Sequence, residues 1–128
     1  MMLFDSDVLI DFLRGAQPGA DRVATELERG DVTVSALTCF ELHVGAHSAR
    51  QQAAVETLLA AATVLPVSRE IAVHGGRLFR ELKGSGREIG MADCLIAATC
   101  LEHRAVLITR NRKHFERISG LELTHMVL

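Results

Sequence analysis

Residues 2–15 read MLFDSDVLIDFLRG, and this stretch decides the fold. Its apolar start, from Met2 to Phe4, predicts a short strand that ends at Asp5. The next apolar residues recur at helical spacing as far as Gly15, which ends the helix: Val8, Leu9, Phe12 and Leu13. A strand that passes straight into a helix is the first half of a β-α-β unit, so this stretch indicates an α/β fold.

The rest of the chain repeats this alternation. Apolar or β-branched runs predict four more strands, at residues 32–35, 63–67, 105–109 and 121–124. Helical spacing and the capping and stop residues predict five more helices, at residues 18–30, 38–49, 50–62, 69–83 and 90–104. Strands that alternate with helices form a mostly parallel sheet covered on both faces. The helix at 90–104 is apolar nearly all round, Met91 included, so we expect it to be buried.

The composition fits one domain with a full core, because 48% of the 128 residues are apolar. Lys and Arg number 14 and Asp and Glu 16, which excludes charge-driven disorder and a polybasic nucleic-acid-binding tail. The chain has no apolar run long enough for a membrane span and no basic signal-peptide start, so we expect a cytoplasmic protein. The three cysteines lack zinc-ligand spacing and are interpreted as buried, reduced thiols.

Polar side chains follow the predicted strands at the points where those strands end. Asp5 and Asp7 follow the first strand, and Asn111 follows the strand at 105–109. Glu41 lies early in the helix after the second strand, and Asp93 lies in the first turn of the buried helix. Functional groups gather at the carboxyl ends of the strands in such sheets, so we expect these residues at one edge.

Several carboxylates brought together at one edge repel one another and raise one another's pKa. Burying them without a countercharge costs several kcal/mol per ion, by general estimate. A divalent cation removes this conflict, and Mg²⁺ and Mn²⁺ prefer carboxylate and water oxygens. Such a site could activate water and stabilise charge on a phosphoryl group.

Each of these side chains also has a purely structural interpretation. Asp5 could cap the helix that follows it, and Asn111 could cap a short last helix. Glu41 stands three residues after Thr38, which is the spacing of a capping box. Asp93 in a first helical turn would gain from the helix dipole. Their joint position at one sheet edge favours the functional interpretation.

Two further acids and the histidines complete the set of titratable residues that the pattern singles out. Asp11 lies one helical turn after Asp7, and we expect it to face solvent. Asp7 is either a hydrogen-bond acceptor that supports the metal ligands or a residue that forms the local turn. The six histidines are dispersed, and we expect them on the surface or hydrogen-bonded.

Four segments resemble the four ordered motifs of PIN-domain ribonucleases of the VapC toxin type. They cover almost the whole chain: Leu3–Gly15, Phe40–Ala46, Ile89–Ala98 and Leu107–Phe115. The fourth motif of the family often has an Asp where this chain has Asn111, and another acid where it has His114. The resemblance therefore implies one well-held ion rather than two.

The resemblance implies a three-layer α/β/α fold, PIN-like, with a mostly parallel sheet of four to five strands in one nuclease domain over residues 1–128. It implies an endoribonuclease that hydrolyses RNA phosphodiester bonds with Mg²⁺ or Mn²⁺. Such an enzyme is the toxin of a toxin–antitoxin pair and inhibits translation and growth. The implied partners are RNA, a VapB-type antitoxin protein and a second copy of the chain in a homodimer.

The resemblance also implies roles for single residues. Asp5 and Asp93 would hold the metal, and Glu41 would complete the acidic cluster. Asn111 belongs to the same catalytic set. Thr109 would orient water or phosphate near the ion, although its strand position also suits a purely structural threonine.

The charge distribution suits a polyanionic substrate better than the total charge does. Residues 1–64 carry four basic and nine acidic residues, whereas residues 65–128 carry ten and seven. Five of the basic residues surround the fourth motif: Arg104, Arg110, Arg112, Lys113 and Arg117. Arg110, Arg112 and Lys113 are the candidate RNA-binding residues. Alternatively, these residues form an ordinary helix surface or contact the antitoxin.

Two other functions remain open at this point. Asp5-Ser6-Asp7-Val8 also fits the start of haloacid-dehalogenase-type phosphatases, but that family needs a Lys and a late acidic pair, and no adjacent acids follow Lys83. The other alternative is a catalytically inactive domain that binds a protein partner, with the acids as helix caps. Metal dependence would separate the nuclease from this second alternative.

Overall fold

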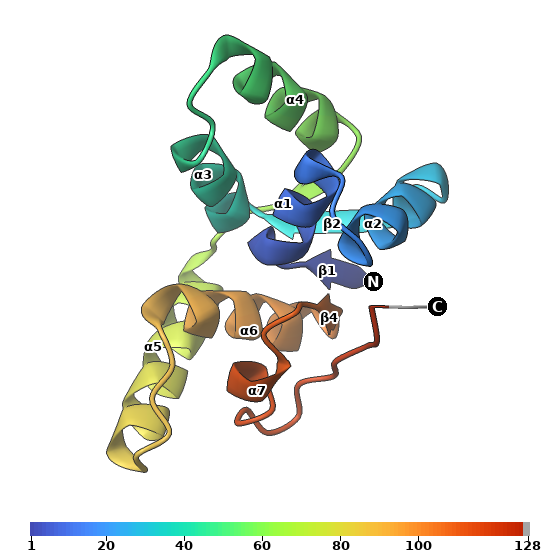
Figure 1. Cartoon of the computed structure of the whole chain (residues 1–128). Helices are drawn as coiled ribbons and strands as arrows, with labels where there is room; N and C mark the ends of the chain where they lie inside the picture. Colours follow the sequence, from blue (N-terminus) through green and yellow to red (C-terminus); the bar gives the residue numbers. More distant parts are fainter. Residues whose placement is uncertain (127–128) are drawn as a thin grey trace.

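The computed structural model describes residues 1–126, in which helices cover both faces of one sheet (Figure 1). The sheet is parallel throughout and has the order β3-β2-β1-β4, with β1 at Met2–Phe4, β2 at Val32–Ser35, β3 at Thr63–Leu65 and β4 at Val106–Ile108. The helices are α1 Ser6–Arg14, α2 Gly19–Glu28, α3 Ala36–Val44, α4 Ala49–Ala60, α5 Arg69–Gly84, α6 Met91–His103 and α7 Arg112–Phe115. This confirms the expected three-layer α/β/α fold.

Each face of the sheet has its own apolar core. Leu3 and Leu107 belong to the core shared with α5, α6 and α7, whereas Phe4 and Ile108 belong to the core shared with α1 to α4. Leu3 pairs with Leu107 and Phe4 with Ile108 in the register of β1 and β4, so the period of two along a strand sends each pair to one face. All four side chains are fully buried, so packing on both faces fixes the positions of the carboxyl ends of β1 and β4.

The signals at Asp5, Gly15 and Ser68 act as expected, whereas α3 begins at Ala36 with Ser35 as its cap and ends at Val44, not at residues 38 and 49. The side chains of Asp5, Ser35 and Ser68 accept hydrogen bonds from backbone N–H groups at the starts of α1, α3 and α5. Gly15 ends α1 with a φ of 70°, a conformation that favours glycine. No helix within residues 1–126 combines the length and apolar character needed to cross a membrane.

Two expectations about the fold are wrong. Residues 121–124 do not form a strand, because Leu123 makes only an isolated bridge to Leu107. The segment pairs with β4 only at Leu107, whose N–H donates to the Glu122 carbonyl at 2.9 Å, and the Arg112 guanidinium donates to the Thr124 carbonyl at 2.8 Å. Met91 is 70% exposed, because the first turn of α6 extends beyond the strands (Figure 1). Of the three free cysteines, Cys94 and Cys100 are buried as expected, and Cys39 is only half-buried.

The carboxyl ends of β1 and β4 lie side by side at the point where the strand order reverses. The connections from β1 to β3 run through α1 to α4 on one face, and the return to β4 runs through α5 and α6 on the other (Figure 1). Such a switch point is where open α/β sheets bind their ligands. The Asp5 N–H donates to the Ile108 carbonyl at 2.9 Å, so the two strand ends are joined directly.

Candidate active site

Asp5 lies where β1 ends and α1 begins. Its Oδ1 accepts a hydrogen bond from the Ser6 N–H at 2.8 Å, which confirms the capping interpretation. Its Oδ2 accepts from the Thr109 hydroxyl, also at 2.8 Å. Asp5 is 7% exposed and Thr109 is 1% exposed. Capping therefore occupies one carboxylate oxygen, and the other faces the end of β4.

Hydrogen bonds to Asp7 hold the loop after β4 against the first turn of α1. The Arg110 N–H donates to Asp7 Oδ2 at 3.0 Å, and the Thr109 hydroxyl lies 3.4 Å from the same oxygen. The Asn111 N–H donates to Thr109 Oγ1 at 3.0 Å. Asp7 is therefore an acceptor for a distant segment and not only a local turn former. We call Asp5, Asp7 and Thr109 the strand wall of the site.

Asp5 is held in a position that disfavours its charge. Burial raises the pKa of Asp5 from 3.8 to about 7, and the charges of Asp7 and Asp93 add to the rise. The hydrogen bonds from Thr109 and Ser6 lower this pKa, but they do not offset burial. An ionised Asp5 at neutral pH therefore calls for a countercharge that these residues do not supply.

Asp7 has a similar but milder conflict. Burial raises the pKa of Asp7, while the backbone and the charge of Arg110 lower it. Asp7 Oδ1 is buried and has no hydrogen-bond partner among residues 1–126. An unsatisfied buried polar atom costs about 1–3 kcal/mol, and more when it is charged. Asp7 Oδ1 is therefore an unpaired oxygen inside the site.

Glu41 and Asp93 come to the site from α3 and α6. The helix that carries Glu41 begins at Ala36 with Ser35 as its cap, so the expected capping box of Thr38 and Glu41 is wrong. Burial raises the pKa of Glu41, and the charge of Asp93 raises it further. The charge of Asp93 thus raises the pKa of both Glu41 and Asp5, so Asp93 lies within electrostatic reach of both.

His114 is a site residue that the sequence interpretation missed. Asn111 precedes α7 without making a capping bond, and its Nδ2 instead lies 2.8 Å from His114 Nδ1. The same Nδ1 lies 3.6 Å from Asp93 Oδ2. The spacing of three residues between Asn111 and His114 is the only sequence signal for this contact. We call Glu41, Asp93 and His114 the helix wall of the site.

Asp11 does not face solvent as expected. Its side chain is 12% exposed and forms an ion pair with Arg110, with Nε and Oδ2 2.7 Å apart. Asp11 also packs against Gly19, where an added Cβ would stand 2.6 Å from the Asp11 Cβ. Because α2 comes close enough to cover this face of α1, Asp11 is buried and anchors the Arg110 side chain.

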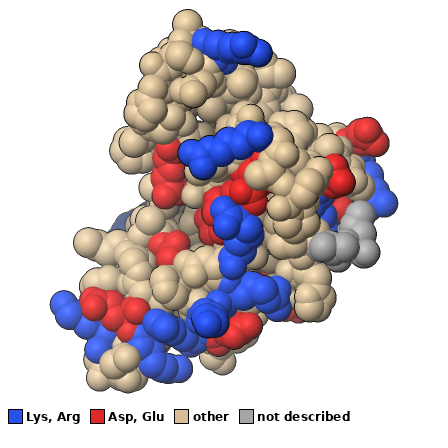
Figure 2. Space-filling model, in the orientation of Figure 1, with Lys and Arg blue, Asp and Glu red and all other residues tan. Residues whose placement is uncertain are grey.

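The three candidate RNA-binding residues differ in their surroundings. Arg110 is paired with Asp11, and Arg112 donates to the Thr124 carbonyl, so both have structural partners. Lys113 is exposed. Figure 2 shows acidic side chains across the middle of one face, bordered by Lys and Arg side chains. This pattern suits a phosphate chain that approaches acids along a basic border.

The donor chemistry of the two walls fits a hard divalent cation. All four acids offer oxygen ligands, Asp5 lacks a countercharge and Asp7 has an unsatisfied oxygen. Within residues 1–126, however, no three acidic, histidine or cysteine side chains converge closely enough to enclose an ion. Mg²⁺ needs only one or two protein carboxylates when water and phosphate complete its shell, so the arrangement still fits such an ion.

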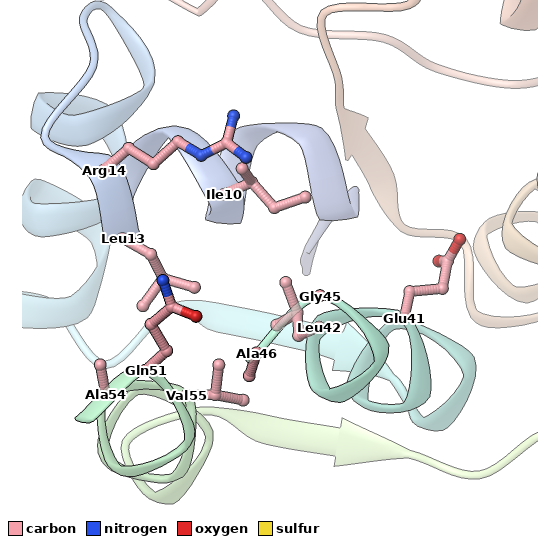
Figure 3. A pocket seen from close by; sticks show the side chains of 10 residues that line it. All are labelled: Ile10, Leu13, Arg14, Glu41, Leu42, Gly45, Ala46, Gln51, Ala54 and Val55. Carbon is pink, nitrogen blue, oxygen red and sulfur yellow. The ribbon is translucent and has the colours of Figure 1, made fainter. Parts of the chain in front are cut away.

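A groove of 170 Å³ runs beside the site between α1, α3 and α4 (Figure 3). Its lining is mostly apolar, with Arg14, Glu41 and Gln51 as the polar exceptions. Glu41 lies at one end of the groove in this view, and Gln51 and Ala54 lie at the other (Figure 3). Glu41 therefore borders both the groove and the acidic site.

Comparison with known proteins identifies the family. Residues 2–121 match the PIN domain. Ribonuclease VapC19 of Mycobacterium tuberculosis is 36% identical over 123 residues, which are 95% of this chain and 98% of that protein.

Solved structures agree with this result. VapBC-1 from nontypeable Haemophilus influenzae matches with a TM-score of 0.82 at 30% identity, over 98% of this chain and 97% of that one. A toxin–antitoxin complex from Klebsiella pneumoniae matches with a TM-score of 0.80 at 30% identity, over 98% of each chain. The chain therefore belongs to the PIN-domain family and, within it, to the VapC-type ribonucleases that are the toxins of toxin–antitoxin systems.

Proposed function

We propose that this chain is an endoribonuclease that hydrolyses RNA phosphodiester bonds with the help of Mg²⁺ or Mn²⁺. The observation that carries the proposal is the buried Asp5, whose pKa of about 7 reflects burial and the nearby charges of Asp7 and Asp93. PIN-domain nucleases are generally metal-dependent, and the donor set of this site consists mainly of carboxylates. The phosphatase alternative is wrong, because the chain belongs to a nuclease family.

Asp5 and Asp93 would hold the cation, with Glu41 as the third acid and Asn111 as a neutral neighbour. A divalent cation, when bound, supplies an activated water and neutralises charge on the phosphoryl group. The chain would hold a single ion, because Asn111 contributes no charge for a second one.

The remaining residues position these acids. Thr109 and the Ser6 N–H hold the two Asp5 oxygens in fixed directions. Asp7 holds the Arg110 N–H and keeps the loop after β4 against α1. Lys113 would attract the RNA backbone toward the acids. Arg112 would contribute its charge as well, while its guanidinium donates to the Thr124 carbonyl.

The partners follow from the relatives. The Klebsiella structure is a toxin–antitoxin complex by name, and the Haemophilus structure is named VapBC-1. We propose that a VapB-type antitoxin binds and neutralises this chain. We also propose a homodimer of a single nuclease domain over residues 1–128, located in the cytoplasm. An excess of the antitoxin should stop RNA cleavage by the purified chain.

The test is RNA cleavage by the metal-free chain, with and without added Mg²⁺ or Mn²⁺, followed by sequencing of the new 5′ ends. We expect discrete cleavage sites that need the metal and vanish in Asp5→Asn and Asp93→Asn. Asp31→Asn is the matched control, because Asp31 is exposed and precedes β2 at the opposite edge of the sheet. Unchanged cleavage in both site variants would contradict the proposal. If the wild type binds the antitoxin but cleaves no RNA with either metal, the chain would instead be a catalytically inactive domain that binds a protein partner.

A further inference from the structure

His114 brings a nitrogen atom to a site that is otherwise made of oxygen atoms. Its Nδ1 lies 3.6 Å from Asp93 Oδ2 and 2.8 Å from the side-chain amide nitrogen of Asn111. The His114 side chain is 44% exposed and that of Asp93 is 27% exposed, so a cation could reach both from solvent. Three side chains from α6 and from the segment at α7 thus meet at one accessible point.

The Asn111 side-chain amide and the Asp93 carboxylate both approach the same ring nitrogen of His114, Nδ1. An amide N–H that donates to Nδ1 leaves a lone pair on that atom and places the ring proton on Nε2. Nδ1 then has no proton to offer Asp93, so two electron-rich atoms face each other across 3.6 Å. The Asn111 amide can also turn over and present its oxygen at the same place. Rotation of the Asn111 amide away from Nδ1 would free the Nδ1 lone pair for a cation, and a cation bound between Nδ1 and Asp93 Oδ2 would replace their repulsion with two attractive contacts.

The separation of the two atoms already suits a shared ion. Two ligand atoms about 2.1 Å from one metal ion stand roughly 3.0–3.6 Å apart at ligand angles between about 90° and 120°. The distance from His114 Nδ1 to Asp93 Oδ2, 3.6 Å, is at the upper end of this range. Small side-chain rotations therefore suffice for both to bind the same ion.

We propose that His114 is a ligand of the divalent cation, beside Asp93, and that it makes the site prefer Mn²⁺ to Mg²⁺. This inference rests on the proposed function, since it concerns the same ion. Imidazole nitrogen suits transition-metal ions, whereas Mg²⁺ favours carboxylate, carbonyl and water oxygens. An all-carboxylate site would bind both ions through the same oxygen atoms and would lack this preference.

The experiment is pulsed electron paramagnetic resonance on the full-length, metal-free chain titrated with Mn²⁺ at pH 8 without RNA. A directly bound imidazole gives a modulation from its ¹⁴N nucleus, which oxygen ligands do not. We expect this modulation in the wild type and its loss in His114→Asp and His114→Gln. His74→Gln is the matched control, because His74 Nδ1 lies 2.9 Å from Glu102 Oε1 in a similar pair formed by α5 and α6.

Binding constants give a second readout. The ratio of Mn²⁺ to Mg²⁺ affinity should fall about tenfold in His114→Asp and stay unchanged in His74→Gln. Mn²⁺ that binds the wild type without ¹⁴N modulation would overturn the role of His114 and leave the proposed function standing. A wild type that binds neither ion, yet is folded, would overturn the proposed function and this inference together. The wild-type spectrum decides the point even if a variant fails to fold.

Discussion

The strand wall and the helix wall meet at one site, but they are built in opposite ways. Asp5 and Thr109 are almost fully buried, and hydrogen bonds of 2.8 Å fix both oxygens of the Asp5 carboxylate. Asp93 and His114 are 27% and 44% exposed, and their contact is 3.6 Å long. One wall is thus fixed by the fold itself, whereas the other is held loosely by two helices.

This difference shows how a protein can keep mutually repelling acids together before a cation arrives. The strand wall tolerates the Asp5 charge through donors from Ser6 and Thr109 and through the burial of both strand ends. The helix wall keeps its side chains partly in water, where their charges cost less. Because the helix wall has fewer fixed contacts, we expect its residues to adjust when an ion and RNA bind.

The largest effect should come from removing the charge that acts on both walls. Asp93→Asn should lower kcat for RNA cleavage about 10³-fold, since several kcal/mol of charge stabilisation would be lost with the cation. Glu41→Gln should cost much less, about tenfold, because the Glu41 charge is not among those that raise the pKa of Asp5 on the strand wall. Steady-state kinetics at saturating metal would measure both. Equal losses in the two variants would contradict the central place of Asp93.

The next effect concerns the stability of the strand wall. Because the pKa of folded Asp5 lies above its unfolded value, the folded metal-free chain binds more protons, and its stability should fall as the pH rises from about 4 to about 7. One pKa unit corresponds to about 1.4 kcal/mol, so removing the Asp5 charge should stabilise the fold at pH 8. An asparagine has one acceptor oxygen where the carboxylate has two, and this loss offsets part of the gain. Asp5→Asn should therefore raise the free energy of unfolding by about 2 kcal/mol at pH 8.

Urea unfolding of metal-free protein between pH 4 and pH 8 measures this change. The variant should show a flatter pH dependence than the wild type, and its stability advantage should disappear as the pH falls toward 4. Asn caps a helix as well as Asp does, so the start of α1 is preserved. A variant that is less stable than the wild type at pH 8 would show that the Asp5 charge is already compensated.

A smaller effect should follow from loosening the loop after β4. Arg110→Ala leaves the Arg110 N–H bond to Asp7 but removes the ion pair with Asp11. We expect kcat to fall about tenfold with little change in KM, because the loop carries Thr109 and Asn111. Stability should fall by about 1 kcal/mol, since the Arg110 side chain is half exposed.

A double-mutant cycle with Asp11→Asn tests this explanation. If Arg110 acts through Asp11, the two substitutions together should cost little more than either alone. If Arg110 contacts RNA instead, the losses should add, and Arg110→Ala should raise KM and weaken the dependence of binding on salt.

The smallest effect should come from Lys113. Lys113→Ala should weaken RNA binding a few-fold at every sequence and reduce the salt slope of the binding constant by about 1. Arg112→Ala should in addition lower stability, because Arg112 holds the Thr124 carbonyl. Filter binding at several salt concentrations measures the first change. A salt slope that stays the same in Lys113→Ala would remove Lys113 from the RNA-binding residues.

The strand wall was more predictable from sequence than the helix wall, for physical reasons. Asp5 and Thr109 directly follow strands whose apolar runs are unambiguous, and parallel strand ends must meet at one edge. Glu41 and Asp93 belong to helices, whose position relative to the sheet depends on packing that local sequence does not determine. The topology favoured a place at this edge for Glu41 and allowed one for Asp93 without requiring it, and the family resemblance supplied their roles.

The errors at Asp11 and His114 share one cause, which is contact between segments far apart in the chain. Asp11 has the spacing of a surface residue, but Gly19 lets α2 approach and cover it. In the sequence, His114 has no acidic neighbour at helical spacing that would pair with it, but in the structure Asp93 of α6 lies beside it. Residues 121–124 have strand-like composition, but their pairing with β4 is limited to the bridge between Leu123 and Leu107.

The central claim is that Asp5 and Asp93, one from each wall, share a single divalent cation. Crystals of the metal-free protein soaked in Mn²⁺, with anomalous diffraction data, test this most directly. We expect one strong anomalous peak within bonding distance of an oxygen of Asp5 and an oxygen of Asp93. A protein that cleaves RNA but shows no peak there, or a peak bound by one wall only, would contradict the account.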